Sequence, residues 1–208
     1  MLPVIILFAK APVSGRVKTR LQPPLNSQQA SSLHIAFVHD LIARLQSAGF
    51  ALELHTDTGT DVWRDTGVTA RLQHEGDLGL KMFHALDDAL RRGVPRAMIV
   101  GTDAPTIPVE YLEALLASET DVALGPAEDG GYYAISARRV QLEMFGGVTW
   151  SASDALQRTI AACAACGLTT EVGPEWWDVD DPVDLERLMR IRDLPPHAAE
   201  WRSSNWSD

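Results

Sequence analysis

The sequence predicts an α/β fold of three layers, in which a mostly parallel central sheet carries helices on both faces. Short apolar runs rich in β-branched residues alternate along the chain with longer segments of helical periodicity. The 208 residues, 46% of them hydrophobic, suffice for a large core without a disulfide or metal staple. No internal repeat or flexible linker divides the chain, so residues 1–193 are expected to form one domain.

The first apolar run, Pro3–Ala9, is predicted to be a buried strand, because it is too short to span a bilayer and lacks the features of a signal peptide. A helix is expected to begin near Ser27 and to end at Gly49, which matches the preferences of helix termini. Strands are predicted at Phe50–His55 and at Thr69–Gln73.

Helices and strands also alternate in the second half of the chain. The expected order is a helix from about Leu80 to Gly93, a strand at Arg96–Gly101, a helix at Pro108–Ser118, a central strand at Asp121–Gly125, strands at Tyr132–Ser136 and Leu168–Val172, and a helix opened by Pro182. Residues 194–208 lack periodicity and are expected to be an irregular tail. The tail tryptophans, Trp201 and Trp206, are expected to dock either on the body of the domain or on a second subunit of a homodimer.

The amino-acid composition narrows the kinds of molecule that the protein is expected to bind. The formal net charge of −10 argues against binding to nucleic acid or to an anionic membrane, and no membrane insertion is expected. Two cysteines, Cys163 and Cys166, lie in a helical pattern without a second ligand pair, so redox or zinc chemistry is not expected. Free thiols of this kind suit a reducing compartment, and we expect a cytoplasmic protein.

A basic segment follows the first strand. Lys10, Arg16, Lys18 and Arg20 surround Gly15 with no carboxylate among them. Ligands of α/β proteins bind at the carboxyl ends of strands, and a glycine there lets backbone N–H groups approach a phosphate that cations neutralise. The segment predicts a site for a small phosphorylated anion, although a solvated loop would have the same composition.

Two aspartates are candidate metal ligands. Asp103 follows a predicted strand, and the next helix is expected to start only at Pro108, so capping is a less natural role for it. Asp180 belongs to the run Asp178-Val179-Asp180-Asp181, in which one carboxylate is expected to cap the helix opened by Pro182. Carboxylates near a phosphate site are what Mg²⁺ or Mn²⁺ requires.

The segment Glu128-Asp129-Gly130-Gly131-Tyr132-Tyr133 allows two interpretations. Paired glycines after acids are typical of a plain hairpin turn. Alternatively, the turn presents Asp129 to a substrate, the glycines admit a bulky ligand, and one tyrosine lines an acceptor pocket while the other faces the core.

Six short sequence motifs, taken together, resemble those of a known protein family. They are F-A-K-A-P-V-S-G-R-V-K-T-R-L, G-D-L-G, G-T-D-A-P, G-P-A-E-D-G-G-Y-Y, G-V-T-W-S and D-V-D-D-P-V-D-L, spread from about Val4 to Leu188. In this order they resemble the bacterial glycosyltransferase-like family associated with arsenosugar biosynthesis. That family belongs to the nucleotide-diphospho-sugar transferase superfamily, whose Rossmann-like fold is called GT-A.

The resemblance implies a glycosyltransferase that moves a sugar from a nucleotide-diphospho-sugar donor to a small acceptor hydroxyl with a divalent metal. The nucleotide would lie among Lys10 to Arg20 and the turn of Gly76, Asp77 and Gly79, and Asp103 would hold the metal. Asp129 is the candidate general base. The other substrate-binding candidates are Gly130, Gly131, Tyr132, Trp150 and Ser151, although Ser151 is equally a helix cap.

Two alternatives remain open at this stage. Molybdenum-cofactor and phospholactate guanylyltransferases resemble this fold and also use a basic loop after the first strand, but they attack the α-phosphate of a nucleoside triphosphate. A binding module that kept the fold and lost catalysis is the other alternative.

Overall fold

The computed structural model describes residues 2–150 and 152–206. In them a seven-stranded sheet has the order β3-β2-β1-β4-β6-β5-β7. Its strands are β1 (Val4–Ala9), β2 (Ala51–Thr56), β3 (Thr69–Leu72), β4 (Ala97–Gly101), β5 (Val122–Pro126), β6 (Tyr132–Ala137) and β7 (Thr170–Val172). All neighbours are parallel except β6, which runs antiparallel to both β4 and β5. The predicted α/β class is confirmed.

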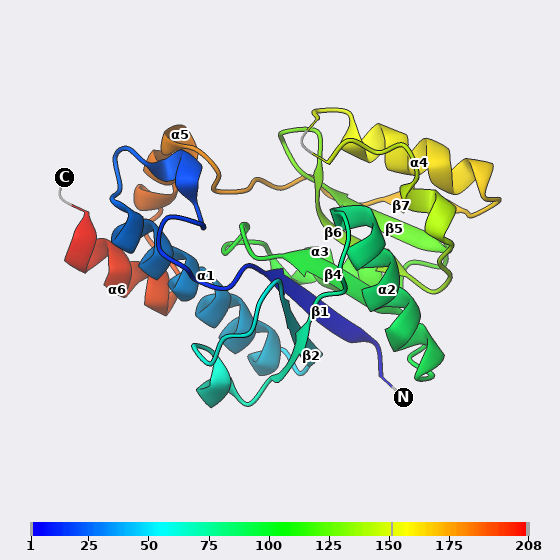
Figure 1. Cartoon of the computed structure of the whole chain (residues 1–208), viewed down its shortest axis with the longest axis horizontal. Helices are drawn as coiled ribbons and strands as arrows, with labels where there is room; N and C mark the ends of the chain where they lie inside the picture. The colour runs from blue at the N-terminus through cyan, green and yellow to red at the C-terminus, as the bar shows by residue number, and fades with distance from the viewer. Residues whose placement is uncertain (1, 151, 207–208) are drawn as a thin grey trace.

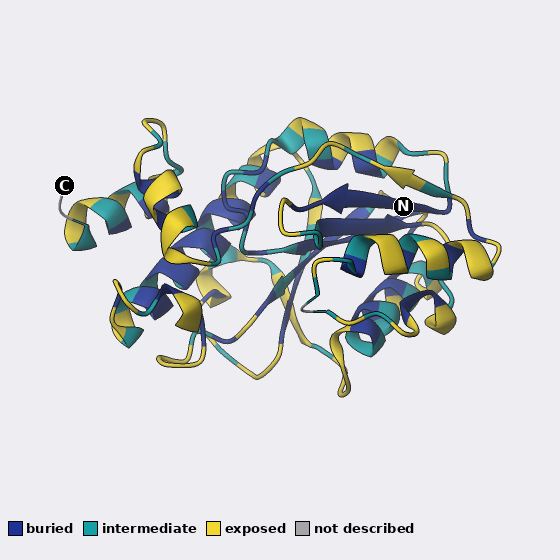
Figure 2. Cartoon of the chain, turned by 90° about the horizontal axis from the view of Figure 1, so that it is seen from above, coloured by how far each residue is buried: buried dark blue, intermediate teal, exposed yellow. Residues whose placement is uncertain are grey.

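The helices form the two outer layers (Figure 1). They are α1 (Ser27–Ser47), α2 (Leu78–Arg91), α3 (Val109–Ala117), α4 (Ala155–Ala165), α5 (Pro182–Met189) and α6 (Pro196–Asn205), with 3-10 turns η1 (Thr19–Leu21), η2 (Arg64–Thr66) and η3 (Leu142–Phe145). Apolar side chains of α1 and α3 pack on one face of the sheet, and those of α2, η3 and α4 on the other. The inner strands β1, β4, β5 and β6 are buried over most of their length (Figure 2), whereas the edge strands β3 and β7 are largely exposed.

The helix termini follow local capping rules. Asn26 is the N-cap of α1, with its side chain accepting from the backbone N–H groups of Gln28 and Gln29. Gln29 returns the bond to the Asn26 N–H and completes a capping box. The cap therefore lies one residue before the predicted start, and Gly49 follows the helix at φ +83° as expected of a helix end.

The predicted central position of the strand at 121–125 is wrong. Strand β5 lies between β6 and β7, next to the edge of the sheet, because the hairpin that follows it places β6 between β5 and β4. The chain leaves β4 through α3 and enters β5 with the same direction, which leaves room for one antiparallel strand between them. Sequence periodicity gives no information about this insertion.

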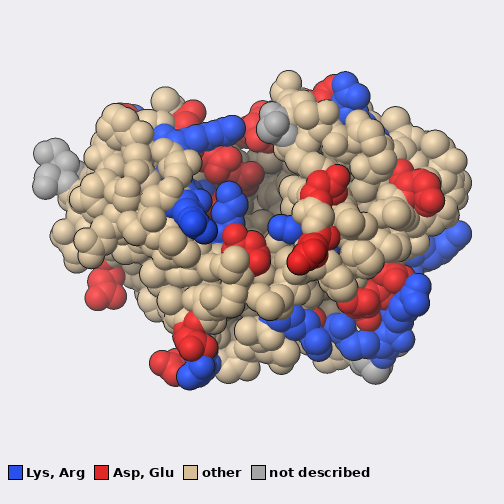
Figure 3. All heavy atoms as spheres, viewed as in Figure 1, with Lys and Arg blue, Asp and Glu red and all other residues tan. Residues whose placement is uncertain are grey.

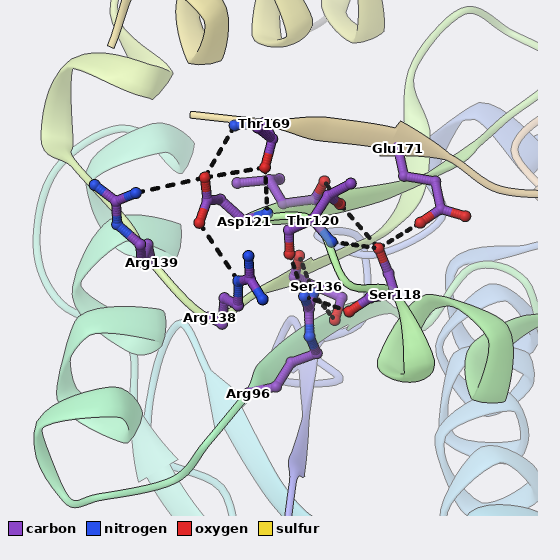
Figure 4. A network of polar contacts seen from close by, with 10 residues as sticks. Arg96, Ser118, Thr120, Asp121, Ser136, Arg138, Arg139, Thr169 and Glu171 are labelled. Atoms are coloured by element: carbon purple, nitrogen blue, oxygen red, sulfur yellow. Dashed lines mark hydrogen bonds and ion pairs between the residues drawn. The ribbon is translucent and has the colours of Figure 1, made fainter. Parts of the chain in front are cut away.

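A polar network closes the end of the sheet where β4, β5 and β7 begin (Figure 4). The buried Asp121 accepts hydrogen bonds from the backbone N–H and the hydroxyl of Thr169, each at 3.0 Å. The pKa of Asp121 is lowered, first by the Thr169 backbone N–H. Arg96 donates to the carbonyls of Ser118 and Thr120 and to Ser136. These contacts tie strand ends at the edge of the sheet opposite the carboxyl ends of β1 and β4.

The irregular tail that the sequence predicts is not found over residues 196–205, which form α6 against α1. The buried Asp40 of α1 accepts from the backbone N–H groups of His197 (2.9 Å) and Ala198 (2.8 Å). The helix start is thus capped by a residue more than 150 positions away, which no local pattern announces. Trp201 is buried, and its Nε1–H donates to Ser32 at 2.8 Å, so it docks on the body of the protein.

Both cysteines are free thiols, with Cys163 buried on the inner face of α4 and Cys166 partly buried. No helix within the described ranges is long and apolar enough to cross a bilayer.

Candidate functional site

A cleft lies at the carboxyl ends of β1 and β4, where the sheet faces the loops that follow these strands. It consists of two adjoining cavities of about 650 Å³ and about 270 Å³, and Asp103, Asp129 and Trp150 line both. Figure 3 shows this face hollowed near its centre, with basic and acidic side chains gathered around the hollow. We call the larger cavity the basic half and the smaller one the acidic half.

The basic half holds every lysine and arginine that lines the described cleft: Lys10, Lys18, Arg20 and Lys81. Carboxylates also line it, but Asp57 accepts the backbone N–H of Ala11 at 2.6 Å, and Asp103 and Asp180 both contact Lys18. In the described chain Lys10, Arg20 and Lys81 make no ion pair. Their charges therefore remain available to an anion.

Side chains of α1 support the loop that follows β1. The Nε2–H of His34 donates to the carbonyl of Lys10 at 2.9 Å, and the hydroxyl of Ser31 donates to the carbonyl of Pro12 at 2.8 Å. Burial lowers the pKa of His34, so the ring serves as a neutral support. Gly15 has φ +80° and Lys18 has φ +48°. A left-handed lysine is uncommon and directs this side chain inward, away from its basic neighbours.

Lys18 is the centre of the site. Its Nζ contacts the Asp103 carboxylate, donates to the carbonyl of Val179 at 2.6 Å, and lies 3.3 Å from Asp180. The three N–H donors of the ammonium thus have three acceptors. The Lys18 side chain is only 4% exposed, whereas the carboxylates of Asp103 and Asp180 are 46% and 41% exposed and face the cleft.

Lys18, Asp103 and Asp180 shift one another's pKa values. Burial alone would lower the pKa of Lys18, but Asp103 and Asp180 outweigh it and raise the pKa. Burial would likewise raise the pKa of Asp103, yet contact with Lys18 lowers it. The pKa of Asp180 is raised by burial and by the charge of Asp103, since Lys18 lies farther from it. Asp103 is therefore the firmly ionised carboxylate of the pair.

Backbone contacts fix the segment that carries Asp180. The Val179 N–H donates to the carbonyl of Asp103 at 2.8 Å, which joins this segment to the end of β4. Asp181 caps α5, and Asp184 returns a bond to its backbone N–H at 3.1 Å. The capping role expected of one aspartate is thus filled by Asp181, which leaves the Asp180 carboxylate for the cleft.

The acidic half is lined by three aspartates and by apolar and aromatic side chains. Its charged residues are Asp103, Asp129 and Asp178, and its other large side chains are Phe8, Leu78, Met82, Ile99, Tyr132, Tyr133, Ile135 and Trp150. Burial, together with the charges of Asp103 and Asp180, raises the pKa of Asp178 to about 7. The hydroxyl of Tyr132 is buried and has no hydrogen-bond partner in the described chain.

The turn between β5 and β6 is a hairpin that also presents a carboxylate. Asp129 accepts the Gly131 N–H at 2.8 Å and lines both halves of the cleft. Gly130 has φ +88°, and a Cβ atom there would lie 1.9 Å from the carbonyl oxygen of Ser153. The expectation that Gly130 admits a bulky ligand is therefore corrected, because it admits the main chain of a neighbouring loop. Gly131 does line the acidic half.

Both tyrosines line the acidic half, and Tyr133 also belongs to the core. Tyr133 is buried, and its hydroxyl donates to the carbonyl of Pro174 at 2.9 Å. Tyr132 contacts Trp150 edge to face, with ring centroids 6.4 Å apart. Trp150 also packs on Gly79, where a Cβ atom would lie 2.7 Å from its ring. Gly79 thus makes room for Trp150.

Nine of the predicted site residues line the cleft, seven of them in its basic half. Those in the basic half are Lys10, Lys18, Arg20, Asp103, Asp129, Trp150 and Asp180; the acidic half adds Gly131 and Tyr132. Six others lie outside its lining: Gly15, Arg16, Gly76, Asp77, Gly79 and Gly130. Asp77 instead caps α2 by accepting the Leu80 N–H at 2.9 Å. Ser151 lies outside the described residues.

Sequence reasoning missed Lys81, His34 and Asp178 as lining residues. Lys81 stands three positions after Leu78 on α2, and both line the cleft, so helical spacing from the start of this helix is the signal that could have found it. His34 reaches the cleft through tertiary packing, and no local signal marks it. Asp178 belongs to the acidic run that the sequence singles out, but nothing local distinguishes it there from Asp180 and Asp181.

Among residues 2–150 and 152–206 no group of three or more His, Cys, Asp or Glu side chains is arranged to hold a metal ion. The predicted pair, Asp103 and Asp180, shares a cation in the form of the Lys18 ammonium.

The chain has relatives with this fold. Residues 28–152 match the family described as "Uncharacterized protein conserved in bacteria" (DUF2064), and the chain belongs to that family. It is 28% identical over 178 residues to a 2-phospho-L-lactate guanylyltransferase of Methanocella arvoryzae, covering 83% of this chain and 74% of that protein.

Solved structures give the same picture. A protein of Desulfovibrio desulfuricans G20, whose name proposes a nucleotide-diphospho-sugar transferase, is 29% identical with a TM-score of 0.86, over 97% of this chain and 95% of the other. The inositol-1-phosphate CTP transferase of T. maritima shares the fold at 12% identity and a TM-score of 0.59, over 96% of each chain. The nucleotidyl- and nucleotide-sugar-transferase fold is therefore shown.

Proposed function

We propose that this protein transfers a glycosyl group from a nucleotide-diphospho-sugar donor to a hydroxyl group of a small acceptor. The observation that carries the proposal is a single cleft in which a half with unpaired cations adjoins a half with carboxylates and aromatic rings. A charged diphosphate and an uncharged acceptor need two such environments side by side.

The basic half would hold the diphosphate. Lys10 and Arg20 follow β1, and Lys81 approaches from α2, so cations reach the cavity from two elements. Departure of the nucleoside diphosphate builds negative charge on its β-phosphate, and fixed cations stabilise that charge.

A divalent metal fits the pair Asp103 and Asp180. Both offer hard carboxylate oxygens to the cleft, and the ammonium of Lys18 already contacts both. Mg²⁺ is commonly held by one or two carboxylates together with water and substrate phosphates, so a third protein ligand is not required. When bound, such an ion would neutralise charge on the leaving diphosphate. Metal binding would compete with Lys18 for these carboxylates.

Asp129 is the proposed general base. Its carboxylate lies on the hairpin where the two halves meet, and one of its oxygens accepts the Gly131 N–H. That bond orients the carboxylate and leaves the other oxygen for an acceptor hydroxyl.

A second candidate function is nucleotidyl transfer. It is supported by the curated relative at 28% identity, which is named a guanylyltransferase. In that reaction an anionic or hydroxyl nucleophile attacks the α-phosphate of a nucleoside triphosphate and pyrophosphate leaves.

The released product separates the two reactions. We would incubate the protein and Mn²⁺ with a panel of nucleotide sugars and, separately, of nucleoside triphosphates. Release of nucleoside diphosphate from a sugar donor supports glycosyl transfer, whereas pyrophosphate release alone overturns it in favour of the second candidate. Thermal stabilisation by nucleotides without turnover of any of them would indicate a binding module.

The variant Asp129→Asn tests the base, with Asp61→Asn as a control of equal charge change at an exposed position outside the cleft. Asp129→Asn should lower kcat far more than donor affinity. Full turnover of Asp129→Asn would exclude Asp129 as the base without affecting the proposed reaction.

A further inference from the structure

We infer that the acidic half selects the second substrate by charge: the part of that molecule entering this cavity is uncharged or cationic, carries an apolar face, and bears no phosphate or carboxylate. This inference deepens the proposed function and rests on it, because only a transferase has a second substrate. The cavity itself does not depend on which transfer reaction occurs.

The charges of the lining support the inference first. Asp103, Asp129 and Asp178 all line this cavity, and its described lining contains no lysine, arginine or histidine. The cations of the cleft, Lys10, Lys18, Arg20 and Lys81, line only the basic half. A phosphate or carboxylate in the acidic half would therefore face like charges, and the ammonium of Lys18, which contacts Asp103, does not itself line this half.

A bound metal ion would not make the acidic half positively charged. A divalent ion between Asp103 and Asp180 would use carboxylates at the border with the basic half. Asp129 and Asp178 would still face the smaller cavity, and neither carboxylate contacts a basic side chain in the described chain. Their oxygens are acceptors for hydroxyl or ammonium donors of a ligand.

Aromatic and apolar residues of the same lining supply the apolar contact. Tyr132 and Trp150 meet edge to face, and Phe145 packs behind Trp150 with ring centroids 6.1 Å apart. Met82 of α2, 4% exposed, belongs to the same lining. The volume of about 270 Å³ suits one ring-sized group, such as a sugar or an aromatic ring.

The test uses probes that share a phenyl ring and carry substituents of different charge: benzyl alcohol, benzylamine, benzoate and benzyl phosphate. The readout is the ¹³C-methyl signal of Met82, which lines the acidic half and not the basic half, assigned by its loss in Met82→Leu. Binding of an anion in the basic half leaves this signal in place. All titrations are run at about pH 8, well above the usual pKa of a carboxylate.

Benzyl alcohol and benzylamine should shift the Met82 signal at concentrations at least about tenfold lower than benzoate or benzyl phosphate, the effect of roughly 1.4 kcal/mol of like-charge repulsion. Asp178→Asn should reduce the preference for benzylamine over benzoate severalfold. Asp61→Asn, with the same change in net charge at an exposed position, should leave it unchanged.

Two results would overturn the inference: equal or tighter binding of the anionic probes at Met82, or a preference that Asp178→Asn and Asp61→Asn alter alike. The experiment needs neither nucleotide nor turnover. Its failure would leave nucleoside diphosphate release as an independent measure of the proposed reaction, and failure of that reaction would leave the probe binding to be judged by itself.

Discussion

Replacing Lys18 with Met should destabilise the protein, and a divalent cation should reverse much of the loss. Methionine keeps the length of the side chain but removes the ammonium that contacts Asp103, Val179 and Asp180. Breaking a fully buried ion pair costs about 3–5 kcal/mol, and an exposed pair is worth about 0–1 kcal/mol. Lys18 is buried at 4% exposure while Asp103 and Asp180 are 46% and 41% exposed, so we expect about 1–3 kcal/mol.

The assay is thermal unfolding with chelator and with Mn²⁺ or Mg²⁺. For a chain of this size about 2 kcal/mol corresponds to a fall in Tm of roughly 4–8 °C. The metal should raise the Tm of Lys18→Met more than that of the natural protein, because the two carboxylates are then free to bind it. Lys81→Met is the matched control, since Lys81 lines the same cavity without an ion pair in the described chain. An unchanged Tm together with equal metal responses of the two variants would refute the reasoning.

Three further predictions concern the hairpin, the polar network and the basic half. Gly130→Ala should cost about 2–4 kcal/mol in urea unfolding, because its Cβ would lie 1.9 Å from the Ser153 carbonyl, whereas Gly147→Ala, at φ +72° with no atom within 4 Å, should cost only about 1 kcal/mol. Asp121→Asn should cost about 1–2 kcal/mol near neutral pH. The pKa of Asp121 is lowered in the folded state, so its contribution to the free energy of unfolding is complete above the unfolded value of 3.8 and is lost as pH falls through the lower folded value. The free energies of unfolding of the natural protein and of Asp121→Asn should therefore converge in acid. A difference that stays constant with pH would contradict this. Arg20→Ala should weaken binding of a nucleoside diphosphate about tenfold by calorimetry, whereas Arg16→Ala on the same loop, outside the cleft lining, should not; equal losses would count against the basic half as the phosphate site.

The strands and helices themselves were largely predictable. The buried runs before Lys10 and Thr102, the cap before α1 and Pro182 at the start of α5 are local signals, and the elements lie within a few residues of their predicted bounds. The placement of Lys10 and Asp103 at one edge of the sheet was also predictable, because parallel strands end at the same edge.

The roles of particular site residues were harder to predict from the sequence. Four basic residues in one loop look equivalent in the sequence, but the left-handed backbone of Lys18 buries it against Asp103 and leaves Arg20 in the cleft lining without Arg16. Glycines are similarly ambiguous. Gly79 and Gly130 suggest space for a ligand, and the fold uses them to admit Trp150 and the Ser153 main chain.

The sequence by itself determined the class of fold, the edge of the sheet that carries the cleft, and the kinds of side chain found there, since these depend on local periodicity, capping and the direction of parallel strands. Only the tertiary structure decided that β6 lies between β4 and β5, that Asp40 caps α6, and that the cations of the cleft line only one of its two halves. These features arise from contacts between segments far apart in the chain, whose geometry is set by packing of the whole core and by burial of charge, and neither is encoded in any short stretch of residues.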